Sequence, residues 1–149
     1  MAETVILLVE DDPADEALTL HALAENKIGN RVDVAHDGAE ALEYLFGNGA
    51  KAALDVHELP QVVLLDLKLP KVDGMEVLRR IRADERTKLL PVVILTTSDE
   101  EDDMVRGYQL GANSYVRKPV SFDQFTSVVK QLGLYWLVIN KCPPGGCTA

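Results

Sequence analysis

The sequence predicts an α/β fold, a doubly wound (βα)5 sheet of five parallel strands in the order 2-1-3-4-5. Short runs of almost wholly aliphatic residues alternate five times with segments that have the period of an amphipathic helix. Aliphatic strands of this kind are typical of a parallel sheet that helices cover on both faces. Right-handed crossovers lead to this strand order, which places a ligand crevice at the carboxyl ends of the first and third strands.

The strands are expected where branched aliphatic residues are densest. Their predicted ranges are 4–9, 32–35, 62–65, 92–95 and 114–117. The third range reads Val-Val-Leu-Leu and is followed directly by Asp66, then by a lysine, a proline and a glycine. A run this apolar predicts a strand buried on both faces, which raises the question of why a carboxylate stands at its end.

The expected helices begin with residues that can cap an N-terminus, each followed three residues later by an acid or an amide. The pairs are Asp12 with Asp15, Asp37 with Glu40, Asp73 with Glu76, Ser98 with Glu101, and Ser121 with Gln124. Pro13 stands at the first helical position, where proline is favoured. Glycines at 29, 47 and 111 mark the expected ends of the first, second and fourth helices.

The length and composition favour one domain. A chain of 149 residues with 47% hydrophobic residues can build one core of ordinary size. We predict a single domain over 1–140, with a long connection at 47–60 and an extended last helix at 121–139, and we expect no further domain. The connection is longer than usual. Surface elaboration is the simpler interpretation of it, and a partner-binding loop is the alternative.

The charge and the termini indicate where the protein acts. Fifteen basic and 24 acidic residues give a net charge of −9, which disfavours binding to nucleic acid and to anionic membranes. The N-terminus has no basic stretch, and no apolar run approaches the roughly 20 residues that span a bilayer. We therefore expect a cytoplasmic protein.

The two cysteines, Cys142 and Cys147, lie in a Pro/Gly tail at 141–149 that is expected to have no fixed structure. In the cytoplasm they are expected to be reduced, and a disulfide or half a metal site are the alternatives.

Acidic residues follow two strands whose carboxyl ends should lie side by side. The first strand ends at Glu10, Asp11 and Asp12, and the third ends at Asp66. Like charges at short range repel one another and raise pKa values, and a divalent cation removes this cost. Because all the ligands are oxygen atoms, Mg2+ is the expected ion. Asp12 precedes Pro13 and suits the N-cap, so Glu10 and Asp11 form the pair that faces the metal.

Two further strand ends carry groups that suit a phosphoryl ligand. Thr96 ends the fourth strand, and Lys118 follows the fifth. A threonine hydroxyl can donate one hydrogen bond to a phosphoryl group held over Asp66, and a lysine ammonium adds a point charge. Each residue alone is more often structural. Their joint occurrence with the acidic residues predicts a phosphoryl-transfer site.

Four segments carry a specific resemblance. "LLVEDDP", "LLDLKLPKVDG", "PVVILTTS" and "GANSYVRKP" resemble, in order and spacing, the signatures of the receiver domain of bacterial response regulators. The similarity covers roughly residues 4–132. It implies the flavodoxin-like receiver fold and a place in a two-component phosphorelay. It also implies a signalling domain that catalyses only its own phosphotransfer and autodephosphorylation, and is otherwise no enzyme.

The resemblance assigns roles to the acidic site. Asp66 would accept a phosphoryl group from a histidine kinase or a histidine phosphotransfer protein. Glu10, Asp11, Asp66 and the backbone carbonyl of Lys68 would arrange Mg2+ and its waters. Lys118 would bind a phosphoryl oxygen.

The resemblance also implies a conformational switch. Thr96 would follow the phosphoryl group, and Tyr115 would rotate inward and remodel the face made by the fourth helix, the fifth strand and the fifth helix. Pro119 occupies a position where the family often has a cis peptide bond. Gly74 matches the family glycine at the start of the third helix.

The C-terminal part offers a candidate interaction surface. The chain is expected to be a stand-alone receiver that signals to an unknown downstream protein. A helical stripe should cover the core: Phe122, Phe125, Val128, Val129 and Leu132. The segment 132–139 is apolar nearly all round, so it either folds back over its own sheet or builds a homodimer through Tyr135, Trp136 and their neighbours; we favour the dimer.

The long loop and the tryptophan-bearing extension are similar to those of stand-alone receivers that partner bacterial and cyanobacterial phytochrome kinases.

Two alternative functions remain for the acidic site. A haloacid-dehalogenase-like phosphatase also uses an aspartyl phosphate, but it carries a second aspartate where this chain has Lys68. A receiver that is never phosphorylated, and acts only as a docking platform, is the other. The three histidines share no metal-ligand spacing and are expected at the surface.

Overall fold

The sheet has five parallel strands in the order β2-β1-β3-β4-β5, so the predicted fold class and strand order are confirmed. The computed structural model of the chain describes residues 4–27, 29–47 and 58–143. The strands are β1 Thr4–Val9, β2 Asn30–Ala35, β3 Val62–Leu65, β4 Val92–Thr96 and β5 Ser114–Arg117. The four strand pairs are all parallel, and the pairing of β1 with β3 joins strands that are not consecutive, so the strand order reverses at β1.

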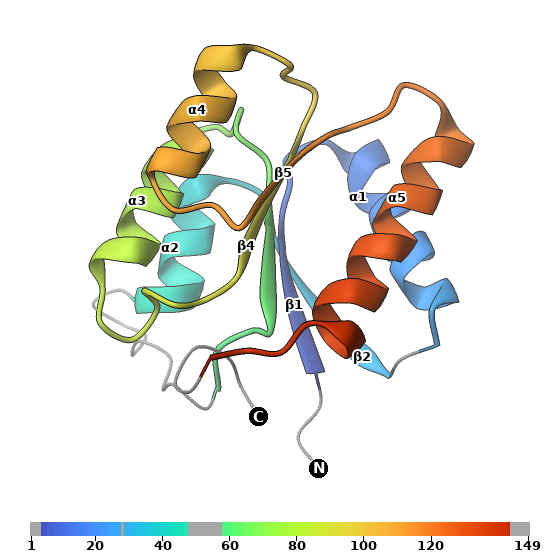
Figure 1. Cartoon of the computed structure of the whole chain (residues 1–149), viewed down its shortest axis with the longest axis horizontal. Helices are drawn as coiled ribbons and strands as arrows, with labels where there is room; N and C mark the ends of the chain where they lie inside the picture. The colour runs from blue at the N-terminus through green and yellow to red at the C-terminus, as the bar shows by residue number, and fades with distance from the viewer. Residues whose placement is uncertain (1–3, 28, 48–57, 144–149) are drawn as a thin grey trace.

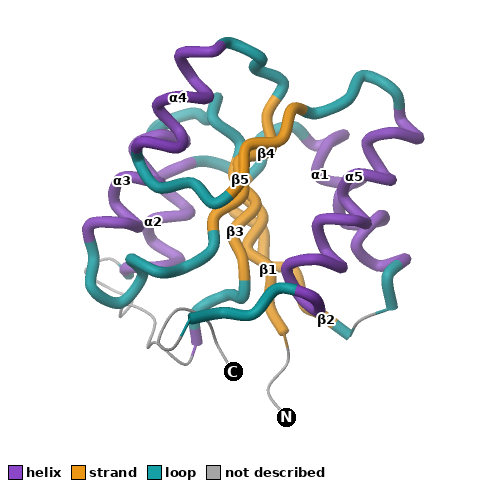
Figure 2. Tube along the Cα trace, in the orientation of Figure 1, coloured by secondary structure: helices purple, strands orange, loops and turns teal. Residues whose placement is uncertain are grey.

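Helices cover both faces of the sheet. They are α1 Pro13–Glu25, α2 Gly38–Phe46, α3 Gly74–Ala83, α4 Glu101–Gln109 and α5 Phe122–Leu134, and α5 continues into a π-helical turn, η2 Tyr135–Ile139. Figures 1 and 2 show α2, α3 and α4 on one face and α1 and α5 on the other. The molecule is therefore a three-layer α/β/α sandwich. Because the strands are parallel, all their carboxyl ends lie at the same edge of the sheet, and each is followed by a loop.

Two apolar clusters form the core, one on each face of the sheet. Along β3, Val63 and Leu65 belong to the cluster under α2 and α3, whereas Val62 and Leu64 belong to the cluster under α1 and α5. All four side chains are at most 2% exposed. Because successive strand residues point to opposite faces, a strand buried on both sides must be aliphatic at every position, as the sequence is here.

Four of the five predicted helix caps are present. The side chains of Asp12, Asp37, Asp73 and Ser121 accept hydrogen bonds from backbone N–H groups in the first turn of their helices. The prediction for Ser98 is wrong, because α4 begins at Glu101 and its N-cap, Glu100, makes no side-chain cap. The Ser98 hydroxyl instead donates to Asp103 Oδ2 over 2.7 Å, so this serine contacts the first turn of α4 without capping it.

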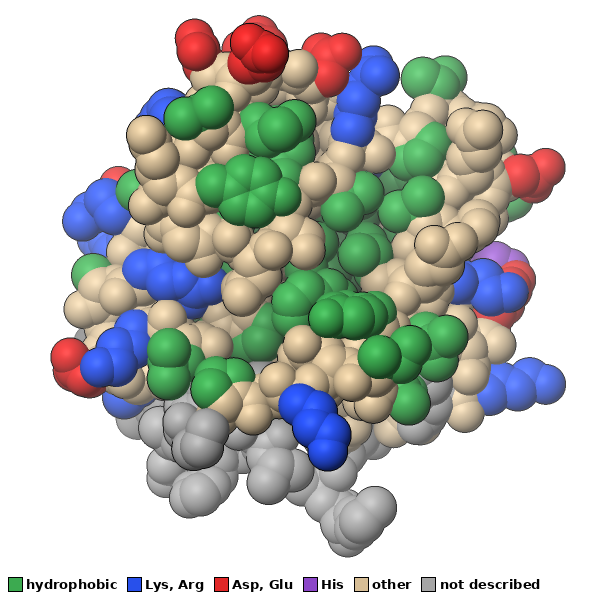
Figure 3. Space-filling view, in the orientation of Figure 1, with side chains coloured by type: hydrophobic (Ala, Val, Ile, Leu, Met, Phe, Trp, Pro, Cys, Tyr) green, Lys and Arg blue, Asp and Glu red, His purple; other side chains and the backbone are tan. Residues whose placement is uncertain are grey.

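The C-terminal turn folds back onto its own domain through one aromatic residue. Trp136 is 8% exposed and belongs to the cluster under α1 and α5. In the preceding stripe Phe125 and Val129 are buried, but Phe122 is 59% exposed. The expectation that Phe122 covers the core is wrong, because it lies at the first position of α5, before the turns that carry the buried Phe125 and Val129. The space-filling view shows hydrophobic side chains gathered between the two helical layers on this side (Figure 3).

Parts of two predicted segments lie outside the described residues, namely 48–57 of the long connection and 144–149 of the tail. Cys142 is disulfide-bonded, so the expectation of a reduced thiol is wrong at this residue. The sequence analysis had kept a disulfide as an alternative to the reduced thiols, and residue 147 lies outside the described residues. Within the described ranges, no helix is long and apolar enough to cross a membrane.

A half-buried guanidinium ties the amino-terminal edge of the sheet to α3. Arg82 donates through Nε to the carbonyl of Gly111 over 2.8 Å, and through its terminal nitrogens to the carbonyl of Leu90 over 2.7 Å and to Asn113 Oδ1 over 2.9 Å. Burial lowers the pKa of Arg82 from its ordinary value. One side chain therefore links α3 to the segments that enter β4 and β5.

Replacing Arg82 by methionine is expected to lower the free energy of unfolding by about 2 kcal/mol, because three acceptors lose a charged donor. Urea denaturation followed by circular dichroism measures the loss. The control is Arg80→Met, on the same helix, whose ion pair with Glu76 is half-exposed and whose loss should cost less than about 0.5 kcal/mol. Equal small losses in both variants would contradict the role of Arg82.

Candidate functional site

Three carboxylates meet at the carboxyl ends of β1 and β3. Glu10 and Asp11 follow β1, Asp66 follows β3, and the last residues of the two strands, Val9 and Leu65, are paired in the sheet. One carboxylate oxygen of each acid lies within 4.8 Å of the others. Glu10 and Asp66 are buried, whereas Asp11 is exposed. The strand pairing therefore brings together the acidic residues that the sequence analysis singled out.

Lys118 crosses the end of the sheet to reach these acids. It follows β5, where its backbone N–H donates to the carbonyl of Thr96 over 2.6 Å. Its Nζ donates to Glu10 Oε1 over 2.6 Å and to Asp66 Oδ2 over 2.9 Å. A third bond, to Asp15 Oδ2, is also 2.9 Å long. An ammonium has three donors, and here each has a carboxylate partner.

The buried charges shift each other's protonation. Burial raises the pKa of Glu10 to about 7, although the hydrogen bond and charge of Lys118 act in the opposite direction, and the charge of Asp66 raises it further. Burial by itself would lower the pKa of Lys118, but its hydrogen bonds to Glu10, Asp15 and Asp66 raise it above the ordinary value. The site thus holds a firmly charged ammonium beside a carboxyl group that titrates near neutral pH.

Thr96 and Tyr115 lie beside the site and meet at the loop between β4 and α4. Thr96 is fully buried, and its hydroxyl oxygen accepts a hydrogen bond from the backbone N–H of Ser98 over 3.4 Å. The Tyr115 hydroxyl donates to the backbone carbonyl of the same Ser98 over 3.0 Å. One loop residue, Ser98, therefore links the two predicted switch residues, and the sequence analysis had assigned it to a helix cap.

The loop after β3 wraps closely around the Asp66 side chain. The backbone N–H of Lys68 donates to Asp66 Oδ1 over 3.3 Å. Gly74 packs so tightly that a Cβ atom there would lie 2.2 Å from the Asp66 carbonyl oxygen. The peptide bond before Pro119 is trans, so the cis bond that the resemblance allowed is not found.

Asp15 is the site residue that the sequence analysis missed. It was assigned to the capping pair at the start of α1, and Asp12 indeed accepts a hydrogen bond from its backbone N–H over 3.2 Å. The contact between its side chain and Lys118 joins residues 103 positions apart. The available signal was an aspartate where a capping box usually has a glutamate, which is too weak to indicate that contact.

A hollow of about 490 Å³ opens beside the acidic residues, between the loop after β3 and α4. Asp11 and Lys68 line it on one side, and Asp103 and Arg106 of α4 line it on the other. Because Asp11 is exposed, the site is open to solvent and to small ions on this side.

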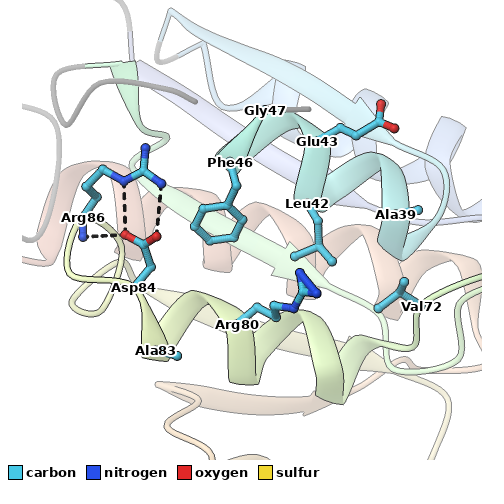
Figure 4. A pocket seen from close by; sticks show the side chains of 10 residues that line it. All are labelled: Ala39, Leu42, Glu43, Phe46, Gly47, Val72, Arg80, Ala83, Asp84 and Arg86. Atoms are coloured by element: carbon cyan, nitrogen blue, oxygen red, sulfur yellow. Dashed lines mark hydrogen bonds and ion pairs between the residues drawn. The ribbon is translucent and has the colours of Figure 1, made fainter. Parts of the chain in front are cut away.

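A second hollow, of about 520 Å³, lies between α2 and α3 (Figure 4). Leu42 and Phe46 of α2 project into it, and Arg86, which is bound to Asp84, holds its guanidinium 5.7 Å from the centre of the Phe46 ring. None of the predicted site residues lines this hollow. It therefore has no part in chemistry at Asp66, and its rim at Gly47 borders residues outside the described ranges.

The fold and the site together define a class of protein, an α/β domain that presents three carboxylates and a lysine at the switch point of a doubly wound sheet. The chain matches the response regulator receiver domain over residues 6–130, and it belongs to this family. It is accordingly a receiver domain of two-component signalling, a class of signalling proteins rather than of conventional enzymes.

Relatives match over nearly the whole chain. It is 43% identical over 142 residues to the probable methanogenesis regulatory protein FilR2 of Methanothrix harundinacea, a match that covers 93% of this chain and 87% of that protein. It is 38% identical over 139 residues to the response regulator Rcp1 of Synechocystis sp., covering 93% and 92%.

Two solved structures are similar throughout. The Mn(2+)-bound form of Rcp1 superimposes with a TM-score of 0.85 at 36% identity, covering 94% of this chain and 99% of that chain. The phosphorylated cyanobacterial phytochrome response regulator RcpA gives a TM-score of 0.84 at 38% identity, covering 95% and 99%. The structural neighbours thus include one receiver with a bound divalent cation and one that is phosphorylated.

Proposed function

We propose that Asp66 accepts a phosphoryl group from a histidine kinase or a histidine phosphotransfer protein, in a reaction that requires Mg2+. The observation that carries the proposal is the buried ammonium of Lys118, which lies 2.9 Å from an oxygen of Asp66 within a group of three carboxylates. The phosphorylated state of the neighbour RcpA supports it. The bound Mn(2+) of Rcp1 supports a divalent cation.

The donor set fits Mg2+. Glu10, Asp11 and Asp66 supply carboxylate oxygens close enough to share one ion, and the backbone carbonyl of Lys68 would complete the protein ligands. Hard oxygen ligands, some of them water, are what Mg2+ prefers. When bound, the cation supplies positive charge that neutralises the phosphoryl oxygens.

The chain's own groups perform the remaining tasks. An Asp66 carboxylate oxygen forms a bond to phosphorus while the bond from phosphorus to the histidine nitrogen breaks, and the nitrogen keeps that electron pair. Lys118 binds a phosphoryl oxygen, and the Thr96 hydroxyl donates a hydrogen bond to another. Such transfers need positioning and charge neutralisation more than covalent chemistry, and a strand end beneath a tight loop holds Asp66 in place.

The signal would leave through the face of α4, β5 and α5. Thr96 and Tyr115 share the loop residue Ser98, so a movement of Thr96 toward a phosphoryl group changes the carbonyl that Tyr115 binds. Large hydrophobic residues are exposed on α4, namely Met104, Val105 and Tyr108. They supply apolar area for a downstream protein that recognises only one state.

The same proposal includes partners of two kinds. The likeness to RcpA, described as a phytochrome response regulator, favours a phytochrome-type kinase in the cytoplasm.

A homodimer would use the exposed residues of the C-terminal turn, namely Leu134, Tyr135, Val138 and Ile139, but not Trp136, which is buried in its own domain. Sedimentation of the wild type and of Val138→Glu tests this: a dimer that persists in the variant would exclude this face.

Phosphorylation of Asp66 can be tested directly. The protein is incubated with acetyl phosphate, with Mg2+ or with a chelator, and its intact mass is measured. We expect one added phosphoryl group with Mg2+, none with the chelator, and none in Asp66→Asn. A folded, Mg2+-binding protein that gains no mass would overturn the proposal and favour the docking-platform alternative.

Mg2+ is expected to raise the unfolding temperature by an increment that grows with pH. Burial raises the pKa of folded Glu10 to about 7 from an ordinary 4.5. Between these values the folded, metal-free protein holds a proton that the unfolded chain lacks, so its stability falls as pH rises through this window. A cation that takes the place of the proton removes that loss.

Differential scanning calorimetry with Mg2+ or with a chelator, at several pH values across this window, measures the increment. The increase in unfolding temperature caused by Mg2+ should grow as the pH rises from 4.5, and it should level off above the folded pKa of Glu10, about 7. The Glu10→Gln variant should lose most of the pH dependence. An increment that is constant with pH in the wild type would contradict the prediction.

A further inference from the structure

Lys118 has three carboxylate partners, and one of them lies outside the group that would hold the cation. Glu10 and Asp66 belong to that group. Asp15 does not, yet its Oδ2 lies 2.9 Å from Nζ, the same distance as Asp66 Oδ2. When a cation binds Glu10 and Asp66 and a phosphoryl group is attached to Asp66, Asp15 is the partner of Lys118 that neither of them engages.

The position of Asp15 is fixed by the first turn of α1. Its backbone N–H donates to the capping carboxylate of Asp12, and its carbonyl accepts a hydrogen bond over 2.7 Å from the hydroxyl of Thr19, which is buried. The helix that carries this turn packs along α5. The Asp15 side chain is therefore presented to Lys118 from a rigid element.

The contact with Asp15 helps to fix the direction of the Lys118 ammonium. Nζ has three N–H groups, and the three acceptors divide them: two point to Glu10 and Asp15, and the third points to Asp66. When a phosphoryl group on Asp66 takes that third donor, the other two bonds still fix the direction of the ammonium. Glu10 is also a cation ligand, so Asp15 is the anchor that the reaction does not otherwise engage.

We propose that Asp15 is a positioning residue for phosphoryl transfer, which acts by holding the Lys118 ammonium toward Asp66. The inference rests on the proposed phosphorylation of Asp66. A role in stability alone is a poor explanation, because the Asp15 side chain is 26% exposed whereas that of Lys118 is 3% exposed. Because the Asp15 carboxylate is only partly buried, its ion pair contributes less to folding than a fully buried pair would, and it orients the buried ammonium.

The test compares Asp15→Ala with Glu16→Ala, its neighbour on the same turn. Both variants remove one negative charge, but Glu16 contacts His36 and not Lys118. We measure the rate of phosphorylation by acetyl phosphate at saturating Mg2+, by intact mass. Asp15→Ala is expected to be about tenfold slower than wild type, the effect of losing one charge-assisted contact that positions a catalytic group, and Glu16→Ala should be unchanged.

The Asp15→Asn variant separates positioning from charge and from folding. Its amide oxygen can still accept the hydrogen bond from Nζ, so it should recover most of the lost rate. Circular dichroism and unfolding temperature establish that each variant is folded. If Asp15→Ala matches Glu16→Ala, or if Asp15→Asn is as slow as Asp15→Ala, the positioning role is overturned. A wild type that is never phosphorylated would instead overturn the proposed function, and this inference with it.

Discussion

Replacing Lys118 by methionine is expected to lower the free energy of unfolding of the metal-free protein by about 3–5 kcal/mol near neutral pH. The side chain is 3% exposed and is the shared partner of three carboxylates. Methionine fills a similar space without a charge. The variant therefore keeps the packing but leaves buried Glu10 and Asp66 with no positive partner, and an uncompensated buried charge is among the most costly single defects.

Urea denaturation at several pH values, with and without Mg2+, measures this loss. It should shrink in acid, because carboxyl groups that take up protons no longer repel one another. It should also shrink with Mg2+, which supplies the missing positive charge. The matched control is Lys130→Met, whose ion pair with Glu25 is half-exposed and should cost less than about 0.5 kcal/mol. A Lys118→Met protein as stable as wild type throughout would contradict the electrostatic account of the site.

Much of the fold follows from the pattern of the strands. The ranges predicted for β1, β3 and β5 are those observed. In β3 the reason is plain, because four apolar residues lie between polar boundaries and leave little choice. The prediction started β2 two residues late. Asn30 and Arg31 extend this strand by pairing with Thr4 and Val5 of β1, and such pairing uses backbone atoms that give no side-chain pattern. Hydrophobic periodicity does not report on an edge strand of this kind.

Some residues of the site could likewise be predicted from the sequence, and others could not. Glu10, Asp11 and Asp66 could be placed together because parallel strands bring their carboxyl ends to one edge of the sheet. Asp15 could not, since its contact depends on the reach of a lysine that crosses from β5. The link between Thr96 and Tyr115 through Ser98 depends on loop geometry. Sequence reasoning thus found the residues fixed by topology and missed those fixed by side-chain reach or by loop conformation.

Replacing Gly74 by alanine is expected to lower the free energy of unfolding by at least about 3 kcal/mol and to slow the phosphorylation of Asp66 by about a hundredfold. An alanine Cβ would lie 2.2 Å from the Asp66 carbonyl oxygen and 2.7 Å from the Leu67 Cα. These are backbone atoms of the segment that carries the phosphoacceptor, so no rotamer change relieves the clash. Either α3 or the end of β3 must move, and both movements displace the Asp66 carboxylate.

Urea denaturation and the acetyl phosphate assay measure the two effects on the same preparation. The matched control is Gly133→Ala in α5, where the new Cβ would meet only side-chain atoms, Asn26 Nδ2 at 2.7 Å and Leu23 Cδ2 at 2.8 Å. Because side chains can turn aside, the control should lose about 1 kcal/mol and keep its phosphorylation rate. If Gly74→Ala were phosphorylated as fast as Gly133→Ala, the close approach of α3 would have no part in holding Asp66, and the rigid strand end alone would have to position it.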